Sequence, residues 1–130
     1  MITNLNFVTV VVNDQDAALD FWTNKLGFEK RADRNFQGFP RFLTVAPKGQ
    51  KEPEIVLVKT GASNIQPPSG GHTGLLFRTD NCQRDFAAFK ERGVKFLSEP
   101  QELPFGIQAL FSDLDGNLFF LVEPRARPAG

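Results

Sequence analysis

The sequence is poor in several kinds of side chain, and each shortage excludes a class of protein. Its 130 residues include no tyrosine, one histidine, one tryptophan and one cysteine. Cys82 has no second cysteine with which to form an internal disulfide, so a disulfide-stabilised domain is excluded. The lack of tyrosine excludes acid–base catalysis by a phenol. The chain has no apolar run of about eighteen residues and no charged-then-apolar leader, so we expect a cytoplasmic protein without a membrane span.

Net charge is also missing. The 15 Lys and Arg residues balance the 15 Asp and Glu residues, so no overall field gathers a polyanion. We therefore expect neither nucleic acid nor a membrane surface as a partner. Phenylalanine is abundant, with 14 residues, so an aromatic pocket wall would carry almost no hydroxyl groups. The length suits a single domain with a core of its own.

The chain contains an internal repeat of strand, helix and turn signals. Residues 5–12 are rich in β-branched types and predict a strand, and a helix follows from the N-cap candidate Asp14 to a stop at Gly27. A second strand prediction at 75–79 is followed by a helix with a stop at Gly93. In each half, a group of roughly three antiparallel strands at hairpin spacing follows the helix.

These signals predict an α+β fold built from two βαβββ modules. Within one domain, 1–130, the boundaries that we expect are 1–61 for the first module, 70–124 for the second and 125–130 for a tail, with a linker at 66–71. A module of about 60 residues buries little surface alone, so we expect the two to share a sheet or to pair across a homodimer. Each sheet should curve around a concave pocket, with its helix on the outer face.

Two motifs carry a resemblance to a known family. The first motif consists of residues 12–14 (VND), Phe21 and Trp22 in the helix, and residues 25–28 (KLGF). It resembles the V-x-D…F-Y-x-x-x-L-G-F opening of the vicinal oxygen chelate superfamily. The second motif, residues 113–117 (DLDGN), resembles the D-P-D-G-N turn of the same superfamily. The superfamily includes glyoxalase I, extradiol dioxygenases, fosfomycin resistance enzymes and bleomycin resistance proteins. The resemblance implies this fold, and either a metal enzyme or a metal-free protein that binds a drug.

The resemblance also locates four metal-ligand positions. In the metal enzymes of the superfamily, four strands supply His, Glu or sometimes Asp to one divalent cation, which stabilises an enediolate or a leaving oxygen. By register with the motifs, these positions fall on Phe7, Val56, Gly74 and Phe120, none of which carries a ligating side chain. We therefore expect no metal cofactor.

One alternative stays open at two neighbouring positions. Glu54 and His72 each lie two residues before an expected ligand position, on the same strand face and roughly 6.7 Å away along the strand. With other groups they are the candidates for holding a divalent metal. In that case the protein would be a glyoxalase-like lyase or isomerase, a dioxygenase or a thiol transferase, so whether it is an enzyme is left open.

The face of each sheet opposite the helix holds the candidate ligand pocket. Strand parity places Phe7 and Phe120 on this face, where they would make an apolar aromatic wall able to stack a flat molecule. Arg41 and Gln108 occupy equivalent places in the repeat and could each supply a polar tip. The candidate pocket residues are Phe7, Thr9, Arg41, Glu54, Val56, His72, Gly74, Leu76, Gln108, Leu118 and Phe120. The function that we favour is binding of a small hydrophobic or aromatic molecule without metal.

Overall fold

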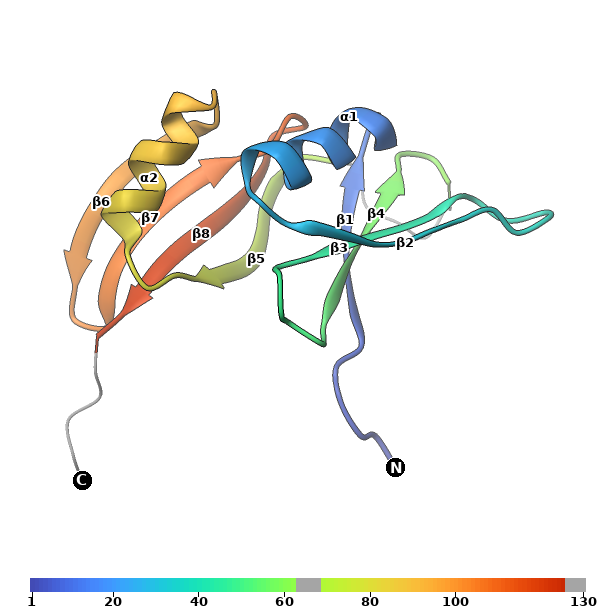
Figure 1. Ribbon diagram of the computed structural model, residues 1–130, viewed down its shortest axis with the longest axis horizontal. Helices are drawn as coiled ribbons and strands as arrows, with labels where there is room; N and C mark the ends of the chain where they lie inside the picture. The colour runs from blue at the N-terminus through green and yellow to red at the C-terminus, as the bar shows by residue number, and fades with distance from the viewer. Residues whose placement is uncertain (63–68, 126–130) are drawn as a thin grey trace. The chain divides into compact units, whose positions relative to one another are not determined.

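The structure is a computed structural model that describes residues 1–62 and 69–125 (Figure 1). The chain forms two compact units, residues 1–70 and residues 71–130. Of the expected linker, residues 66–68 lie outside the described residues, as do tail residues 126–130. In the described part of the chain, no helix has the length and apolar character needed to cross a membrane.

The first unit has the expected strand–helix–three-strand order. Its four-stranded sheet has the order β1-β4-β3-β2, with β1 parallel to β4 and the other pairs antiparallel. The elements are β1 (Phe7–Val12), α1 (Gln15–Asp20), η1 (Phe21–Lys25), β2 (Glu29–Arg34), β3 (Phe42–Ala46) and β4 (Glu54–Lys59).

The helix of this unit begins and stops where the sequence predicts, with Gly27 at φ +80°, but its last turn is not α-helical. The Asp14 side chain accepts a hydrogen bond from the Ala17 N–H at 3.0 Å, which makes it the N-cap. The last turn, η1, is a π turn in which the Leu26 N–H donates to the Phe21 carbonyl at 3.2 Å. A π turn rotates less per residue than an α turn, so the neighbours Phe21 and Trp22 both face the core and are buried.

The second unit repeats this topology. Its sheet has the order β5-β8-β7-β6, again with one parallel pair, β5 with β8. The elements are β5 (Gly71–Arg78), α2 (Cys82–Glu91), β6 (Lys95–Leu103), β7 (Gly106–Ser112) and β8 (Asn117–Pro124). The α+β fold with two βαβββ modules is therefore confirmed, although β5 begins at Gly71, inside the expected linker and earlier than the strand predicted at 75–79.

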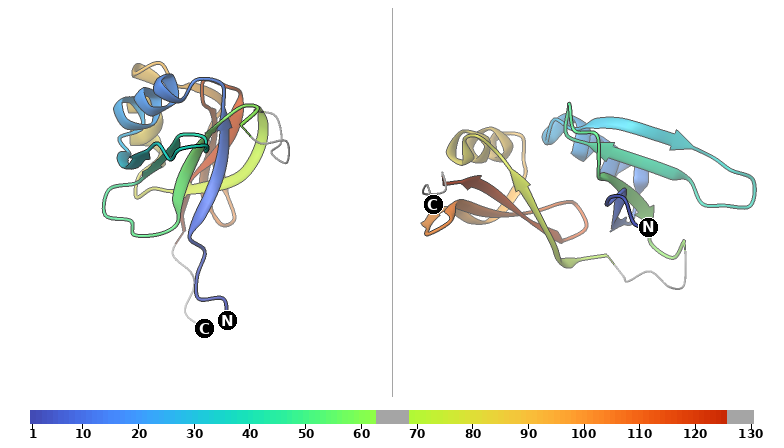
Figure 2. Two further views of the ribbon diagram at one scale, coloured as in Figure 1. Left: turned by 90° about the vertical axis from the view of Figure 1, so that its right-hand side faces the viewer. Right: turned by 90° about the horizontal axis from the view of Figure 1, so that it is seen from below.

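The core of each unit lies between its helix and its own sheet (Figure 2). In the first unit, Leu43, Val45 and Leu57 point to the helix and have no exposed surface. In the second unit, Phe111 and Phe119 also point to the helix and are almost completely buried, with ring centroids 5.6 Å apart and planes tilted by 33°. The alternate residues of these strands lie on the opposite side of each sheet, which we call the open face, and there the burial is incomplete.

Candidate functional site

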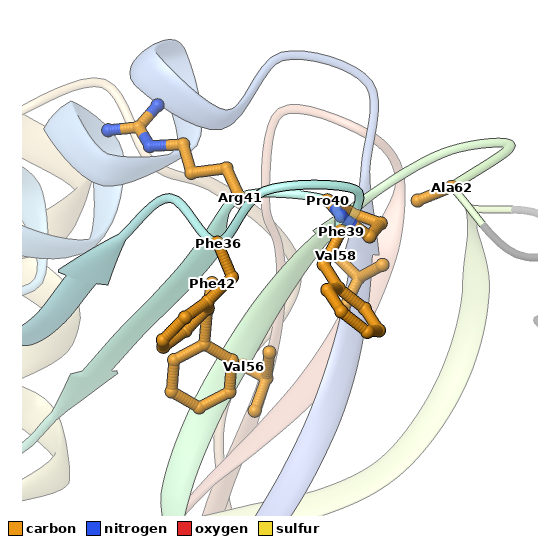
Figure 3. Close-up of a pocket in the computed structure, with 8 residues that line it drawn as sticks. All are labelled: Phe36, Phe39, Pro40, Arg41, Phe42, Val56, Val58 and Ala62. Carbon is orange, nitrogen blue, oxygen red and sulfur yellow. The ribbon is translucent and has the colours of Figure 1, made fainter.

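A hollow of about 460 Å³ lies on the open face of the first unit (Figure 3). Its wall is almost entirely hydrocarbon and comes from β3, β4, the segment between β2 and β3, and the turn that follows β4. The lining residues are Phe36, Phe39, Pro40, Arg41, Phe42, Val56, Val58 and Ala62. Volumes of this size are typical of small-molecule sites.

Two of the phenylalanines reach the hollow from one tight turn. The Phe39 N–H donates to the Phe36 carbonyl at 3.0 Å, and Gly38 between them has φ +81°, which favours glycine. The ring of Phe39 stands on one side of the hollow and the rings of Phe36 and Phe42 on the other, with Val56 between them (Figure 3). Phe36 is 51% exposed and Phe39 74% exposed, and together they form an exposed apolar patch at the hollow, as binding surfaces often do.

Arg41 lines the hollow, but its charge points elsewhere. The guanidinium donates two hydrogen bonds of 2.8 Å to the Asp33 carboxylate and one of 2.8 Å to Asp16 on α1. The hydrogen bonds from Arg41 lower the pKa of Asp33, and the same contacts raise the pKa of Arg41. The guanidinium is directed away from the phenylalanine rings (Figure 3). This corrects the expectation that Arg41 supplies a polar tip inside the pocket, because its carboxylate partners lie on the helix side of the sheet.

Glu54 brings a carboxylate to the open face beside the hollow. The Thr44 hydroxyl donates to Glu54 Oε1 at 2.7 Å and itself accepts the Ala32 N–H at 3.0 Å. Phe7 stands opposite Glu54 in the β1–β4 ladder, and its ring meets the Phe42 ring edge-on with centroids 5.6 Å apart. The apolar wall and the carboxylate are therefore neighbours on one face.

The other sequence-predicted residues of the first unit share this face. Thr9 pairs with Val56 across the β1–β4 ladder, and Thr44 pairs with Val56 across the β3–β4 ladder. Residues directly opposite each other in a ladder point to the same side of a sheet. Phe7, Thr9, Glu54 and Val56 thus form one surface, as strand parity predicted.

The remaining predicted residues gather on the open face of the second unit. His72 is opposite Leu118 and its ring stacks on Phe120, with centroids 6.0 Å apart and planes 17° from parallel. Leu76 is opposite Phe120 and is 59% exposed. Gly74 lies in the register shift between His72 and Leu76 and has φ +76°. Gln108 also belongs to this face, opposite Val122 in the β7–β8 ladder.

The donor set of these faces does not fit the divalent cation of the superfamily's metal enzymes. Phe7, Val56, Gly74 and Phe120 offer no side-chain donor. Within residues 1–62 and 69–125, no three His, Cys, Asp or Glu side chains form a group that could hold a metal ion.

Two buried titratable groups of the second unit serve the fold. Burial raises the pKa of the Cys82 thiol, and its Sγ lies 3.7 Å from the Leu121 carbonyl oxygen. Burial also raises the pKa of Asp113, whose carboxylate accepts the backbone N–H groups of Asp115 and Asn117, both at 2.9 Å. The Asn117 side-chain amide donates to Asp113 as well, at 2.8 Å. These contacts hold the β7–β8 turn.

Comparisons with known proteins agree with this architecture. Residues 4–121 match the model of the Glyoxalase/Bleomycin resistance protein/Dioxygenase superfamily. YetH of Bacillus subtilis (strain 168) is 32% identical over 123 residues, which cover 95% of this chain and 100% of that protein.

Solved structures extend the comparison. A member of the same superfamily from Sphaerobacter thermophilus DSM 20745 is 37% identical with a TM-score of 0.88, covering 94% of this chain and 98% of that chain. TnmS3, an antibiotic binding protein from Streptomyces sp. CB03234, is 40% identical with a TM-score of 0.85, covering 95% and 98%. The chain belongs to the Glyoxalase/Bleomycin resistance protein/Dioxygenase superfamily.

Proposed function

We propose that this protein binds a small hydrophobic or aromatic molecule, without a metal, in the hollow of the first unit. The observation that carries the proposal is the set of phenylalanine rings that face one another across Val56, two of them more than half exposed. Each Å² of apolar surface that a ligand and these rings remove from water contributes about 25 cal/mol. Offset or edge contacts between aromatic rings add about 0.5–1.5 kcal/mol per pair.

The similarity to TnmS3 supports an organic, drug-like ligand, since that protein is described as an antibiotic binding protein. The lack of donors at the superfamily's ligand positions supports binding over metal-dependent chemistry. We further propose that the protein works in the cytoplasm. We also propose that it is a homodimer, because exposed apolar residues such as Leu76 on the open face of the second unit favour burial against another surface.

A panel of fused-ring aromatic compounds tests the proposal. We expect binders to raise the melting temperature and to bind with a measurable Kd by calorimetry. Replacing the exposed Phe39 with Ala should weaken binding by about tenfold, since large aromatic side chains dominate binding energies. Phe105→Ala, at a 53% exposed phenylalanine of the second unit, is the matched control and should leave the Kd unchanged.

Two results would overturn the proposal. One is the absence of any binder in the panel. The other is binding that disappears with a chelator, together with a stoichiometric metal that is lost in His72→Ala, which would favour the metal-enzyme alternative.

A further inference from the structure

The carboxylate of Glu54 is held in place by a chain of hydrogen bonds that starts in the edge strand β2. The Ala32 N–H donates to Thr44 Oγ1, and the Thr44 hydroxyl donates its one proton to Glu54 Oε1. Thr44 is fully buried, so this donor does not turn to water instead. The orientation of the carboxylate is therefore set by the sheet.

A β-bulge makes this chain possible. The β2–β3 register shifts between Lys30 and Ala32, which leaves Arg31 as the extra residue. The shift directs the Ala32 N–H to the Thr44 hydroxyl. The other carboxylate oxygen, Oε2, receives no hydrogen bond from the described residues, so it is available to a ligand.

The second unit shows that the fold does not need this carboxylate. Its edge strand β6 has a register shift in the same place, between Phe96 and Ser98, and the Ser98 hydroxyl accepts the Leu110 N–H at 3.1 Å. Val56 pairs with Thr44 in the first unit, and Phe120 pairs with Leu110 in the second, so Val56 and Phe120 are equivalent. Two residues earlier in each strand, Leu118 is therefore the equivalent of Glu54. The same bulge thus forms beside a leucine, and the acidic side chain of the first unit is not explained by folding alone.

From this juxtaposition we propose that Glu54 selects ligands that carry a protonated amine beside a flat apolar body. The inference rests on the proposed binding in the hollow. Glu54 lies two residues from Val56 on the same side of β4, roughly 6.7 Å along the strand, which is within the length of a small organic molecule. The Phe7 ring opposite it also favours a cation, because the face of an aromatic ring carries partial negative charge.

Positive side chains near the site work in the opposite direction. Arg31, the bulge residue, is already paired with the Glu29 carboxylate and donates to the backbone carbonyls of Pro47 and Gln50. Arg34 is opposite Phe42 in the β2–β3 ladder, hence on the same face, and it is exposed. The charge of Arg34 is exposed to water and separated from Glu54 by the strand β3, so its effect is screened more than that of the carboxylate beside the bound amine.

Three probes with the same three-ring body test the inference: aminomethylanthracene as the cation, anthracenemethanol as the neutral compound and anthracene carboxylate as the anion. We expect the wild type to bind aminomethylanthracene about tenfold more tightly than the carboxylate, in line with one partly exposed charge-assisted hydrogen bond. Glu54→Gln keeps the size of the side chain but removes its charge. It should weaken aminomethylanthracene binding by about fivefold and leave anthracenemethanol within about twofold.

The controls separate charge selection from a structural role. Glu91→Gln makes the same charge change at an exposed position on α2 and should change none of the three affinities. Thr44→Val should lower the preference for the cation, and Thr44→Ser, which keeps the hydroxyl, should restore it. Equal changes for all three probes in Glu54→Gln, or no change for any, would overturn the inference while leaving the proposed function standing. If none of the three probes binds the wild type, the proposed function fails and this inference with it.

Discussion

The Phe39 N–H donates to the Phe36 carbonyl, and this single 3.0 Å hydrogen bond closes the turn that brings both rings to the mouth of one hollow. The two side chains come from a loop, yet the turn fixes their separation. Because a backbone closed in this way loses less freedom when a ligand arrives, the turn favours tight binding of a flat molecule.

The turn is tested by replacing Gly38 with Ala. Gly38 has φ +81° and nothing within 4 Å of an added Cβ, so the cost comes from the backbone alone, about 1 kcal/mol. We expect ligand binding to weaken more than stability does, because a relaxed turn moves Phe36 relative to Phe39. Gly49→Ala is the matched control, with φ +83° and equally open surroundings in the turn between β3 and β4. It should lower the melting temperature by a similar amount with an unchanged Kd, and equal Kd values for the two variants would contradict the prediction.

The ion pairs of Arg41 predict a pH dependence of stability. The hydrogen bonds from Arg41 lower the pKa of Asp33 below 3.8 in the folded state, so this carboxylate binds protons less readily there than in the unfolded chain. Its contribution to stability is complete above the unfolded pKa and is lost as the pH falls through the folded one. Urea unfolding of the wild type and Arg41→Met between pH 2 and about 6 checks this. We expect the difference between the two proteins to shrink towards the acid end, and a constant difference would contradict the assignment.

Strand parity predicted which side chains share the open face of the first unit, although Val56 alone of the four predicted strand residues there lines the hollow. Phe7, Thr9, Glu54 and Val56 do share one face, because side chains alternate along a strand and the alternation extends from the buried positions to the open ones. The internal repeat predicted the two modules, because each half of the sequence carries its own helix caps and its own periodic apolar residues.

The sequence analysis missed what depends on loops and on distant partners. Phe36 and Phe39 were not among the candidates, although a glycine between two phenylalanines at turn spacing was the available signal. The strand residues Phe42 and Val58 of the hollow were missed too. The direction of the Arg41 side chain was not predictable from the repeat. It is set by Asp33 and by Asp16, which reaches Arg41 from the helix, 25 positions away in sequence.

A close approach of two chain segments predicts that Gly106 tolerates no side chain. A Cβ added there would lie 2.2 Å from the backbone oxygen of Glu123, and the residue has φ +151°. Both segments are strands of one sheet, so neither can move aside cheaply. We expect Gly106→Ala to lower the free energy of unfolding by about 3 kcal/mol or more, as for other overpacked sites. Gly74→Ala, at φ +76° with nothing within 4 Å, should cost about 1 kcal/mol in the same denaturation experiment.

The β7–β8 turn depends on which of its side chains accepts hydrogen bonds. Asp113 Oδ1 accepts two backbone N–H groups, and its Oδ2 accepts the side-chain amide of Asn117. In Asp113→Asn an NH2 group replaces Oδ2, so two NH2 groups, both donors, face each other. We expect this variant to lose about 1–3 kcal/mol of stability at neutral pH. Adding Asn117→Asp restores one donor facing one acceptor, so the double variant should recover part of the loss, as a double-mutant cycle in urea would show.

Burial of the same carboxyl gives the turn a pH signature opposite to that of Asp33. Because burial raises the pKa of Asp113 above 3.8, the folded protein binds its proton more readily than the unfolded chain. This contribution is fully present below the unfolded pKa and is lost as the pH rises through the folded one. The stability that wild type loses between pH 3 and about 6 through this group should therefore be absent in Asp113→Asn. Parallel curves for the two proteins across that range would show that Asp113 titrates normally and that its burial has no electrostatic cost.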